Sequence, residues 1–459
     1  MRYIPHSKAD IQAMLEKVGA KSVDELFDQI PSALRFKGEL QLPPAMSEAE
    51  LEAHLEQLAG GSPARGLASF LGAGAYCHHV SPAVDQLLLR SEFYTAYTPY
   101  QPEVSQGTLQ AIFEFQTMVC RILGMEVSNA SMYDGATAMT EAALMARRVK
   151  GREKIVVSSG VHPEYRETLA TYLRASDDGA PKIVVVDVDD ATGATPLDAL
   201  RAAVGDDAAC VIVGYPNFFG VAERVDEIAK IASAAGALSV TSTSEPFAFG
   251  VLAPPGALGV DIATCEGQAL GVPVSFGGPG VGLFAIRNDK NLLRQMPGRL
   301  IGQTVDSKGE TGYVLTLSTR EQHIRREKAT SNICTNHGLC ALSVGINLSL
   351  LGKAGFADVA RSCLSRAEYL KRGVAAIPGL SLRFAGPTFN EFAVRAKGRK
   401  AARILDGMEK KGFLAGVDLG RFAARLDDSF LVAVTECTSR ERLDGYIRAL
   451  AEVVAAAGA

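Results

Sequence analysis

Between about residues 105 and 290, short apolar runs alternate with amphipathic segments, and few folds accommodate this pattern. Helical segments separate the early runs, at 163–173, 196–204 and 225–235. Short buried strands that alternate with helices form βαβ units and a mostly parallel sheet. We therefore predict a large α/β domain over residues 66–318. The apolar runs lie at 155–157, 183–186, 211–213, 238–240, 262–264 and 282–286.

The two ends of the chain have different patterns. In the first 65 residues, Ser22 is followed by Glu25 and Ser47 by Glu50, the spacing of a capping box, in which side chain and backbone groups satisfy each other at a helix start. Residues 1–65 are therefore predicted to form a helical arm that packs on a larger body or on another subunit. Residues 319–459 are predicted to form a connecting helix and a small α+β domain. Its strands are expected at 392–394 and 430–434, and its helices at 399–411 and 439–456.

Charge and cysteine usage exclude several classes of partner. A net charge of −4 and a pI near 6.1 argue against nucleic acid and an acidic membrane surface. The polar N-terminus does not resemble a signal peptide, and no uninterrupted apolar run is long enough to cross a bilayer, so we expect a cytoplasmic protein without a membrane partner. The eight cysteines contain no C-x-x-C pair. No metal site is predicted at Cys77-His78-His79, because adjacent residues rarely supply three ligands to one ion.

Three long, irregular motifs suggest a family. They are FYTAYTPYQPEVSQG at 93–107, NASMYDG at 129–135 and TREQHIRREKATSNICT at 319–335. Together they closely resemble the glycine decarboxylase P-protein family of the glycine cleavage system. The resemblance covers essentially the whole chain and corresponds to the N-terminal half of the long form, which some organisms carry as a separate alpha subunit.

The resemblance implies a fold-type-I transferase-like architecture dependent on pyridoxal phosphate (PLP). It also implies that the complex decarboxylates glycine and passes the aminomethyl group to the lipoyl arm of the H-protein. The conjugated cofactor acts as an electron sink in such chemistry. A heterotetramer with a beta subunit is expected.

Two groups that the resemblance calls for are missing. In active members a lysine forms a Schiff base with the cofactor, and an aspartate holds the ring nitrogen protonated. The matching positions here are Gln268 and Ser242. An amide cannot form an imine, and serine supplies no charge. We therefore expect the partner beta subunit to bind PLP covalently, and this chain not to. A catalytically dead structural or regulatory homologue remains an alternative, and an enzyme that uses another lysine is a third.

Tyr94, Tyr97 and Tyr100 are the candidate catalytic residues, as contributions to the partner's site. Neighbouring prolines favour an extended path, in which tyrosines three residues apart line one edge. A tyrosine-rich interface without a role in the chemistry explains the pattern equally well.

Two further segments have more than one interpretation. Gly135-Ala136-Thr137 precedes a helix and could cradle a phosphate, although a plain helix start explains it equally. The basic residues around Arg320 could attract carboxylates, although a solvated helix face with internal ion pairs is favoured.

Overall fold

The computed structural model describes residues 5–94, 106–174, 182–320, 322–333 and 335–456, which form two compact units, Met1–Arg65 and Gly66–Ala459. The first unit contains α1 (Lys8–Val18), the 3-10 turn η1 (Asp24–Phe27) and α2 (Glu48–Gly60). Ser7 and Ser47 form capping boxes at the starts of the two α-helices. At the capping box predicted from Ser22, Oγ of Ser22 accepts the N–H of Glu25 at 3.4 Å, but the Glu25 carboxylate accepts the N–H of Lys21, and only the short turn η1 follows.

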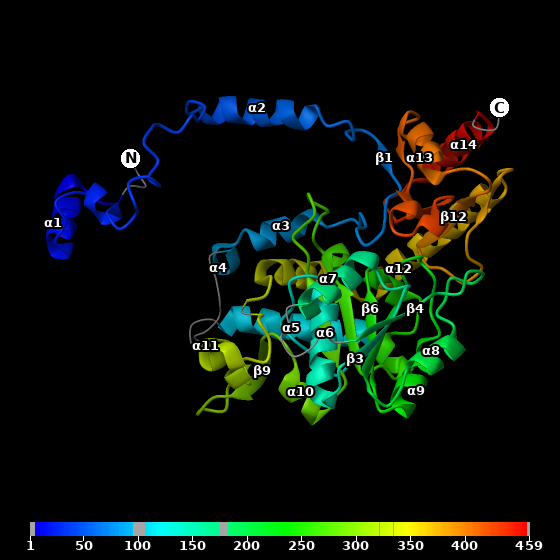
Figure 1. The fold of residues 1–459 in the computed structure, drawn as a ribbon, viewed down its shortest axis with the longest axis horizontal. Helices are drawn as coiled ribbons and strands as arrows, with labels where there is room; N and C mark the ends of the chain where they lie inside the picture. The colour runs from blue at the N-terminus through cyan, green and yellow to red at the C-terminus, as the bar shows by residue number, and fades with distance from the viewer. Residues whose placement is uncertain (1–4, 95–105, 175–181, 321, 334, 457–459) are drawn as a thin grey trace. The chain divides into compact units, whose positions relative to one another are not determined.

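A seven-stranded sheet forms the centre of the second unit (Figure 1). Its strand order is β2-β8-β7-β6-β5-β3-β4. The neighbouring pairs from β4 to β7 are parallel, whereas β8 pairs antiparallel with both β7 and β2. Each apolar run of the sequence lies in one of these strands. The bounds are β2 Val127–Ser128, β3 Lys154–Ser158, β4 Ile183–Val186, β5 Ala208–Gly214, β6 Leu238–Thr243, β7 Ile262–Glu266 and β8 Gly282–Ile286.

Helices cover both faces of this sheet, as its apolar strands require. Neighbouring β7 residues point to opposite sides, so Ile262 joins the core with α6 and α7, whereas Ala263 joins the core with α5 and α12. Figure 1 shows α6 and α7 in front of β3 and β6. The bounds are α5 Gln106–Leu123, α6 Gly135–Lys150, α7 Pro163–Arg174, α8 Leu197–Ala203, α9 Val225–Ala234 and α10 Lys290–Gln295.

The long element α12 (Gly338–Ala375) connects this core to a smaller one. It is apolar and long enough to span a membrane by length and composition. However, Gly352 interrupts it with φ 60° and ψ −177°, and the element packs into two hydrophobic cores, the one with α5 as far as Leu364 and the smaller one from Ala367 onward. We therefore interpret α12 as a core element of the folded unit.

The smaller core contains a four-stranded antiparallel sheet with order β11-β12-β15-β14, covered by α13 and α14 (Figure 1). The predicted strands and helices of this region are all present. The bounds are β11 Leu380–Leu382, β12 Glu391–Ala396, α13 Ala401–Glu409, β14 Val417–Asp418, β15 Ser429–Ala433 and α14 Arg440–Ala456. A further short pair joins β1 (Ala68–Ser69) to β13 (Phe413–Leu414).

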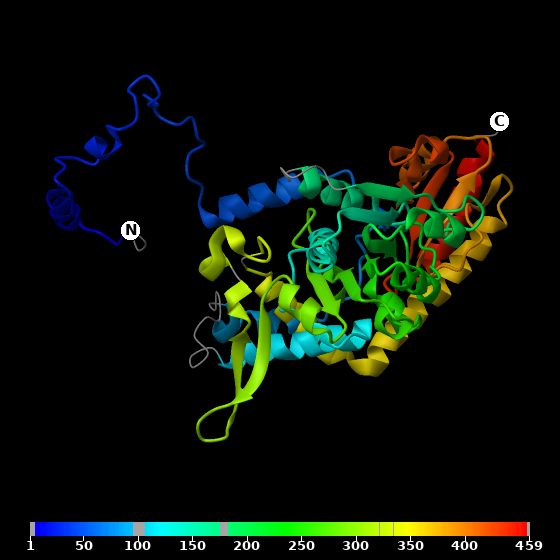
Figure 2. The same ribbon diagram turned by 60° about the horizontal axis from the view of Figure 1, so that its bottom comes forward.

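The remaining elements are a hairpin and short helical turns. Figure 2 shows the hairpin of β9 (Leu300–Val305) and β10 (Thr311–Thr316) projecting from the sheet-containing unit. The other bounds are α3 Pro82–Leu88, α4 Ser91–Tyr94, η2 Pro246–Gly250, η3 Pro255–Leu258, η4 Gln268–Leu270, η5 Ser318–Arg320, α11 Gln322–Arg325, η6 Arg326–Lys328, η7 Leu419–Arg421 and η8 Ala424–Leu426.

Candidate functional site

The carboxyl ends of the parallel strands bring three predicted positions into one region. Ser242 lies near the end of β6, Gln268 begins η4 after β7, and Gly135 begins α6. Open parallel sheets bind ligands at this edge, because loops and helix starts converge there. The structure therefore tests directly whether the chain could hold PLP itself.

The side chain of Gln268 is engaged by its own loop. Its amide nitrogen donates to the carbonyl oxygen of Val272, and its backbone N–H donates to Oε1 of Glu266 at 2.8 Å. Ser242 is 6% exposed, and its carbonyl oxygen accepts a hydrogen bond from the N–H of Tyr215 at 3.0 Å. The region thus presents an amide and a hydroxyl where covalent attachment and ring protonation would need an amine and a carboxylate.

The start of α6 holds a buried carboxylate. Oε2 of Glu266 accepts the N–H of Gly135, and Oε1 accepts those of Gln268 and Val281, each at 2.8 Å. Burial raises the pKa of Glu266, and the nearby Asp134 charge adds to this, while the three N–H donors act in the opposite direction. The position that could cradle a phosphate is therefore filled by a side chain of the same chain.

Two rings line the neighbouring space. The rings of His162 and Tyr165 lie 4.8 Å apart, and Nε2 of His162 bonds the carbonyl oxygen of Ala73 at 2.8 Å. Burial lowers the pKa of His162, so the neutral ring donates through Nε2. Nδ1 then accepts the N–H of Glu164 at 3.2 Å. This hydrogen bonding orients the histidine toward the backbone of its own chain.

Pyridoxal phosphate does not fit this arrangement. Its phosphate would meet the carboxylates of Glu266 and Asp134, and its aldehyde would meet the amide of Gln268. The edge of the sheet keeps the form of a cofactor site, but it has neither the covalent anchor nor a free anion cradle.

A separate cavity of about 260 Å³ brings the family motifs together. Its lining includes Tyr94 from the first motif, Thr335 from the third, and the buried Arg299. The adjoining Asn336 also lines it and donates to the carbonyl oxygen of Ala130, in the second motif, at 2.9 Å. Segments far apart in the sequence therefore meet around one cavity.

The predicted tyrosine row is only partly described. Tyr94 ends the single helical turn α4 and is 61% exposed, so the extended path predicted for the row does not hold at this residue. Tyr97 and Tyr100 lie outside the described residues. Their role as candidate catalytic residues stays a prediction.

The interpretation of Arg320 as part of a solvated helix face is wrong. Its side chain is buried, and its guanidinium donates to the carbonyl oxygens of Leu317, Met296 and Gly298. A buried guanidinium is stable here because backbone carbonyls take its donors. Arg320 therefore anchors the third motif to the loop that precedes β9.

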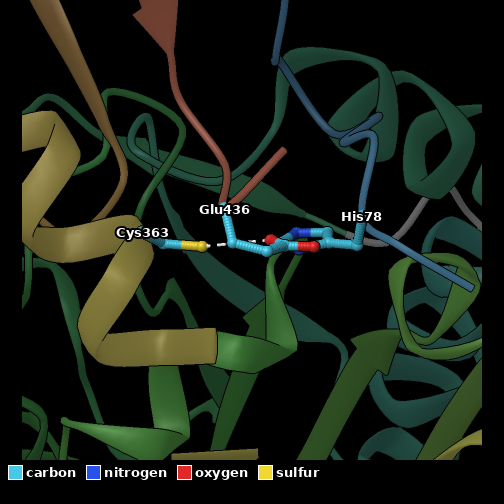
Figure 3. A group of neighbouring side chains, drawn as sticks. All are labelled: His78, Cys363 and Glu436. Atoms are coloured by element: carbon cyan, nitrogen blue, oxygen red, sulfur yellow. Dashed lines mark hydrogen bonds and ion pairs between the residues drawn. The ribbon is translucent and has the colours of Figure 1, made fainter. Parts of the chain in front are cut away.

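A second polar cluster lies around His78 (Figure 3). Nδ1 of His78 bonds Oε2 of Glu436 at 2.7 Å, and Nε2 bonds Oε2 of Glu245 at 2.8 Å, with the ring 1% exposed. Cys363 lies beside Glu436, and the potential ligand atoms of His78, Cys363 and Glu436 lie within 4.8 Å of one another.

This cluster is satisfied as a buried ion pair. Burial lowers the pKa of His78, but the Glu245 charge and the hydrogen bonds to Cys363, Glu245 and Glu436 outweigh it, so the net pKa is raised. Burial raises the pKa of Glu436, but the hydrogen bond and charge of His78, together with backbone hydrogen bonds, outweigh it and lower the pKa to about 2. A charged imidazolium between two carboxylates joins residues far apart in the chain.

The motifs did not indicate Glu266 or the partners of His78. Glu266 follows an apolar run in a way typical of many strand ends, and its three donors come from separate segments. Glu245 and Glu436 are 167 and 358 residues from His78. The one available sequence signal was an acidic residue two positions before the one where the lysine was expected.

Comparison with known proteins gives consistent results. A family model described as the glycine cleavage system P-protein matches residues 1–450. A Sorangium cellulosum protein called "Probable glycine dehydrogenase (decarboxylating) subunit 1" is 54% identical over 451 residues, which cover 98% of this chain and 99% of that protein.

Solved structures agree with this match. A crystal structure of glycine decarboxylase (P-protein) of the glycine cleavage system, in inhibitor-bound form, has a TM-score of 0.89 and 41% identity, covering 99% of this chain and all of that chain. The Burkholderia pseudomallei sphingosine-1-phosphate lyase has a TM-score of 0.67 and 17% identity, covering 93% and 94% of the two chains. The second likeness concerns the fold alone. The predicted fold-type-I architecture is confirmed.

Proposed function

This chain belongs to the glycine cleavage system P-protein family, and on that premise we propose that it acts as subunit 1 of a glycine dehydrogenase (decarboxylating). In this proposal a partner subunit carries the lysine and PLP. The complex decarboxylates glycine and passes the aminomethyl group to the lipoyl arm of the H-protein.

One observation carries the assignment of roles between the subunits. The cofactor edge of this chain is closed by Glu266 and presents no anchoring amine. A different cavity is lined by residues of the first and third family motifs, and the second motif is hydrogen-bonded to Asn336 in its wall. A chain that held the cofactor would need an open cofactor edge, whereas a chain that contributes residues to a neighbour's site needs only the cavity.

The cavity has the chemistry of a supporting wall. Tyr94 offers a phenol, Arg299 a permanent positive charge, and Asn336 an amide. Such groups can orient a small anionic substrate while aromatic rings exclude water. In this proposal Tyr97 and Tyr100 also contribute to the partner's site.

The alternative of a dead structural or regulatory homologue is not carried forward. It rested on Gln268 and Ser242 alone, and both replacements are equally compatible with the non-lysine subunit of a working pair. The relative described above is called a glycine dehydrogenase subunit over nearly the whole shared length.

The absorption spectrum with added PLP tests the proposal. We expect no borohydride-reducible adduct on the isolated chain, and a reducible adduct on the partner when both subunits are co-expressed. An adduct on this chain alone would contradict the assignment of the cofactor.

The tyrosines need a separate experiment. Tyr97→Phe and Tyr100→Phe should lower glycine turnover by about 10–100-fold if the phenols hold substrate or cofactor. Tyr369→Phe is the matched control, because its phenol donates to Asp444 beyond the break in α12. Unchanged turnover and unchanged assembly in both test variants would contradict a role of these phenols in the chemistry.

A further inference from the structure

Glu266 makes more contacts with backbone donors than a helix cap requires. Its N–H donors come from the first residue of α6, from η4 and from the residue before β8. The cap of α6 is already supplied by Asp134, whose Oδ1 accepts the N–H of Thr137 at 2.8 Å. Glu266, which lies 131 residues from Gly135 in the sequence, is a second carboxylate at this helix start and therefore serves a different purpose.

We propose that the Glu266 carboxylate is a built-in substitute for a phosphate group, and that it keeps phosphorylated ligands out of this chain. It lies at a helix N-terminus, where backbone donors and the helix dipole favour an anion. Three N–H groups from separate segments point at one anion, which is how backbone cradles hold phosphate oxygens. The proposal deepens the proposed function, because it gives a physical reason for the cofactor to reside on the partner.

The glycines around Glu266 support this interpretation. A Cβ on Gly135 would lie 3.0 Å from the Glu266 side chain and 2.7 Å from the Tyr165 hydroxyl. A Cβ on Gly280 would lie 2.9 Å from the Cβ of Asp134 and 3.0 Å from Oε2 of Glu266. Phosphate-binding turns use glycine for this reason, so that backbone can approach the anion closely. The form of the cradle is intact, and only its occupant differs.

Two carboxylates at this position exclude phosphate by charge as well as by space. The Asp134 charge already raises the pKa of Glu266, and a phosphate dianion beside both would meet stronger repulsion. Shortening Glu266 removes the occupant and leaves three buried N–H donors without an acceptor. Buried donors without acceptors are costly, so an added anion should be taken up there.

Thermal unfolding of the isolated full-length chain in inorganic phosphate tests the proposal. We expect Glu266→Ala to melt below the wild-type chain in chloride buffer, and its melting temperature to rise with the logarithm of the phosphate concentration at constant ionic strength. The wild-type chain should show no such rise. Equal responses of variant and wild type to phosphate would overturn the proposal.

Glu223→Ala is the matched control. Glu223 is also buried and accepts hydrogen bonds from the N–H of Thr195 and from Nδ2 of Asn217, but it engages one backbone N–H group and not three. This variant should lose stability without recovering it in phosphate. Equal recovery in both variants would mean that phosphate stabilises the chain in general, and the proposal would fail.

A second variant covers the case in which Glu266→Ala does not accumulate as folded protein. Glu266→Ser, expressed and purified with and without phosphate, should give more folded chain with phosphate. Equal yields in the two buffers would again overturn the proposal. The test uses neither PLP nor the partner, so its failure leaves the assignment of the cofactor to the partner untouched, and a failure of that assignment leaves this test valid.

Discussion

Removing the imidazole in His78→Ala leaves one buried carboxylate, Glu245, and one partly buried carboxylate, Glu436, without the cation that lies between them. The side chains of Glu245 and Glu436 are 4% and 16% exposed, and each forms a hydrogen bond of 2.7–2.8 Å to the ring. Removing one partner from a buried ion pair costs about 3–5 kcal/mol, because the remaining charge is buried without compensation. We expect His78→Ala to lower the free energy of unfolding by that amount near pH 7.

The pH dependence gives a second, sharper readout. Burial lowers the pKa of His78, but the Glu245 charge and the hydrogen bonds to Cys363, Glu245 and Glu436 together outweigh it, so the pKa is raised in the folded chain. Its contribution to stability is therefore complete below the unfolded pKa, about 6.5, and is lost as pH rises toward the folded pKa. Each pH unit above about 6.5 should remove about 1.4 kcal/mol of this contribution. The gap between wild type and variant should thus narrow from about pH 7 to 9.

Urea unfolding followed by circular dichroism measures both effects, with the denaturation midpoint and slope fitted at each pH. His54→Ala is the control, because His54 lies exposed on α2 and its loss should change stability by no more than about 0.5 kcal/mol. Adding Glu245→Gln to His78→Ala should cost less than the sum of the single changes, since one partner is already missing. A loss below about 1 kcal/mol, or a pH-independent gap, would refute the ion-pair reasoning. Stoichiometric zinc in the wild-type chain that is absent from His78→Ala would instead identify a metal site.

Three further results are expected. Burial raises the pKa of Glu391 to about 7, and the Glu245 charge adds to this. The contribution of the protonated Glu391 carboxyl to stability is therefore present at low pH and lost as pH rises through about 7. Glu391→Gln should gain up to about 3 kcal/mol over the wild type between about pH 4.5 and 8 in urea unfolding, and no relative gain would contradict the shift. Gly220→Ala should lower the melting temperature more than Gly259→Ala, although both glycines have positive φ. A Cβ at 220 would lie 1.9 Å from the carbonyl oxygen of Glu391, whereas a Cβ at 259 would have no neighbour within 4 Å. The extra loss of stability is about 1–3 kcal/mol, and equal losses in the two variants would contradict the steric argument. Gln268→Lys alone should form no borohydride-reducible adduct with PLP, because Glu266 still fills the cradle; an adduct would show that the cradle is open.

The central sheet was predictable because its determinants are local. Most strands from β3 to β8 contain a short apolar run between turns, because strands covered on both faces are mainly apolar. β6 is the exception, with buried serine and threonine side chains. The helices of the C-terminal region were equally visible from their periodicity. The capping-box pattern at Ser22 predicted a helix where only the turn η1 forms, because a local start signal does not determine how far a helix continues.

In the candidate site, too, some features were predictable from local sequence and others were not. Family motifs located Gln268, Ser242 and the tyrosine row, since each is a substitution or spacing within one segment. The burial of Arg320 could not be predicted, because it depends on carbonyl groups from the loop before β9.

The sequence by itself determined the family and the order of strands and helices along the chain, and it predicted that Gln268 stands where the family has a lysine, because these depend on residue type and local spacing. Only the tertiary structure decided which distant side chains meet. It directed Glu266 to the start of α6 and enclosed His78 between two carboxylates. The physical reason is that hydrogen bonds and charge pairs act over a few ångströms in space, and chain separations of 131 to 358 residues carry no local signal of them.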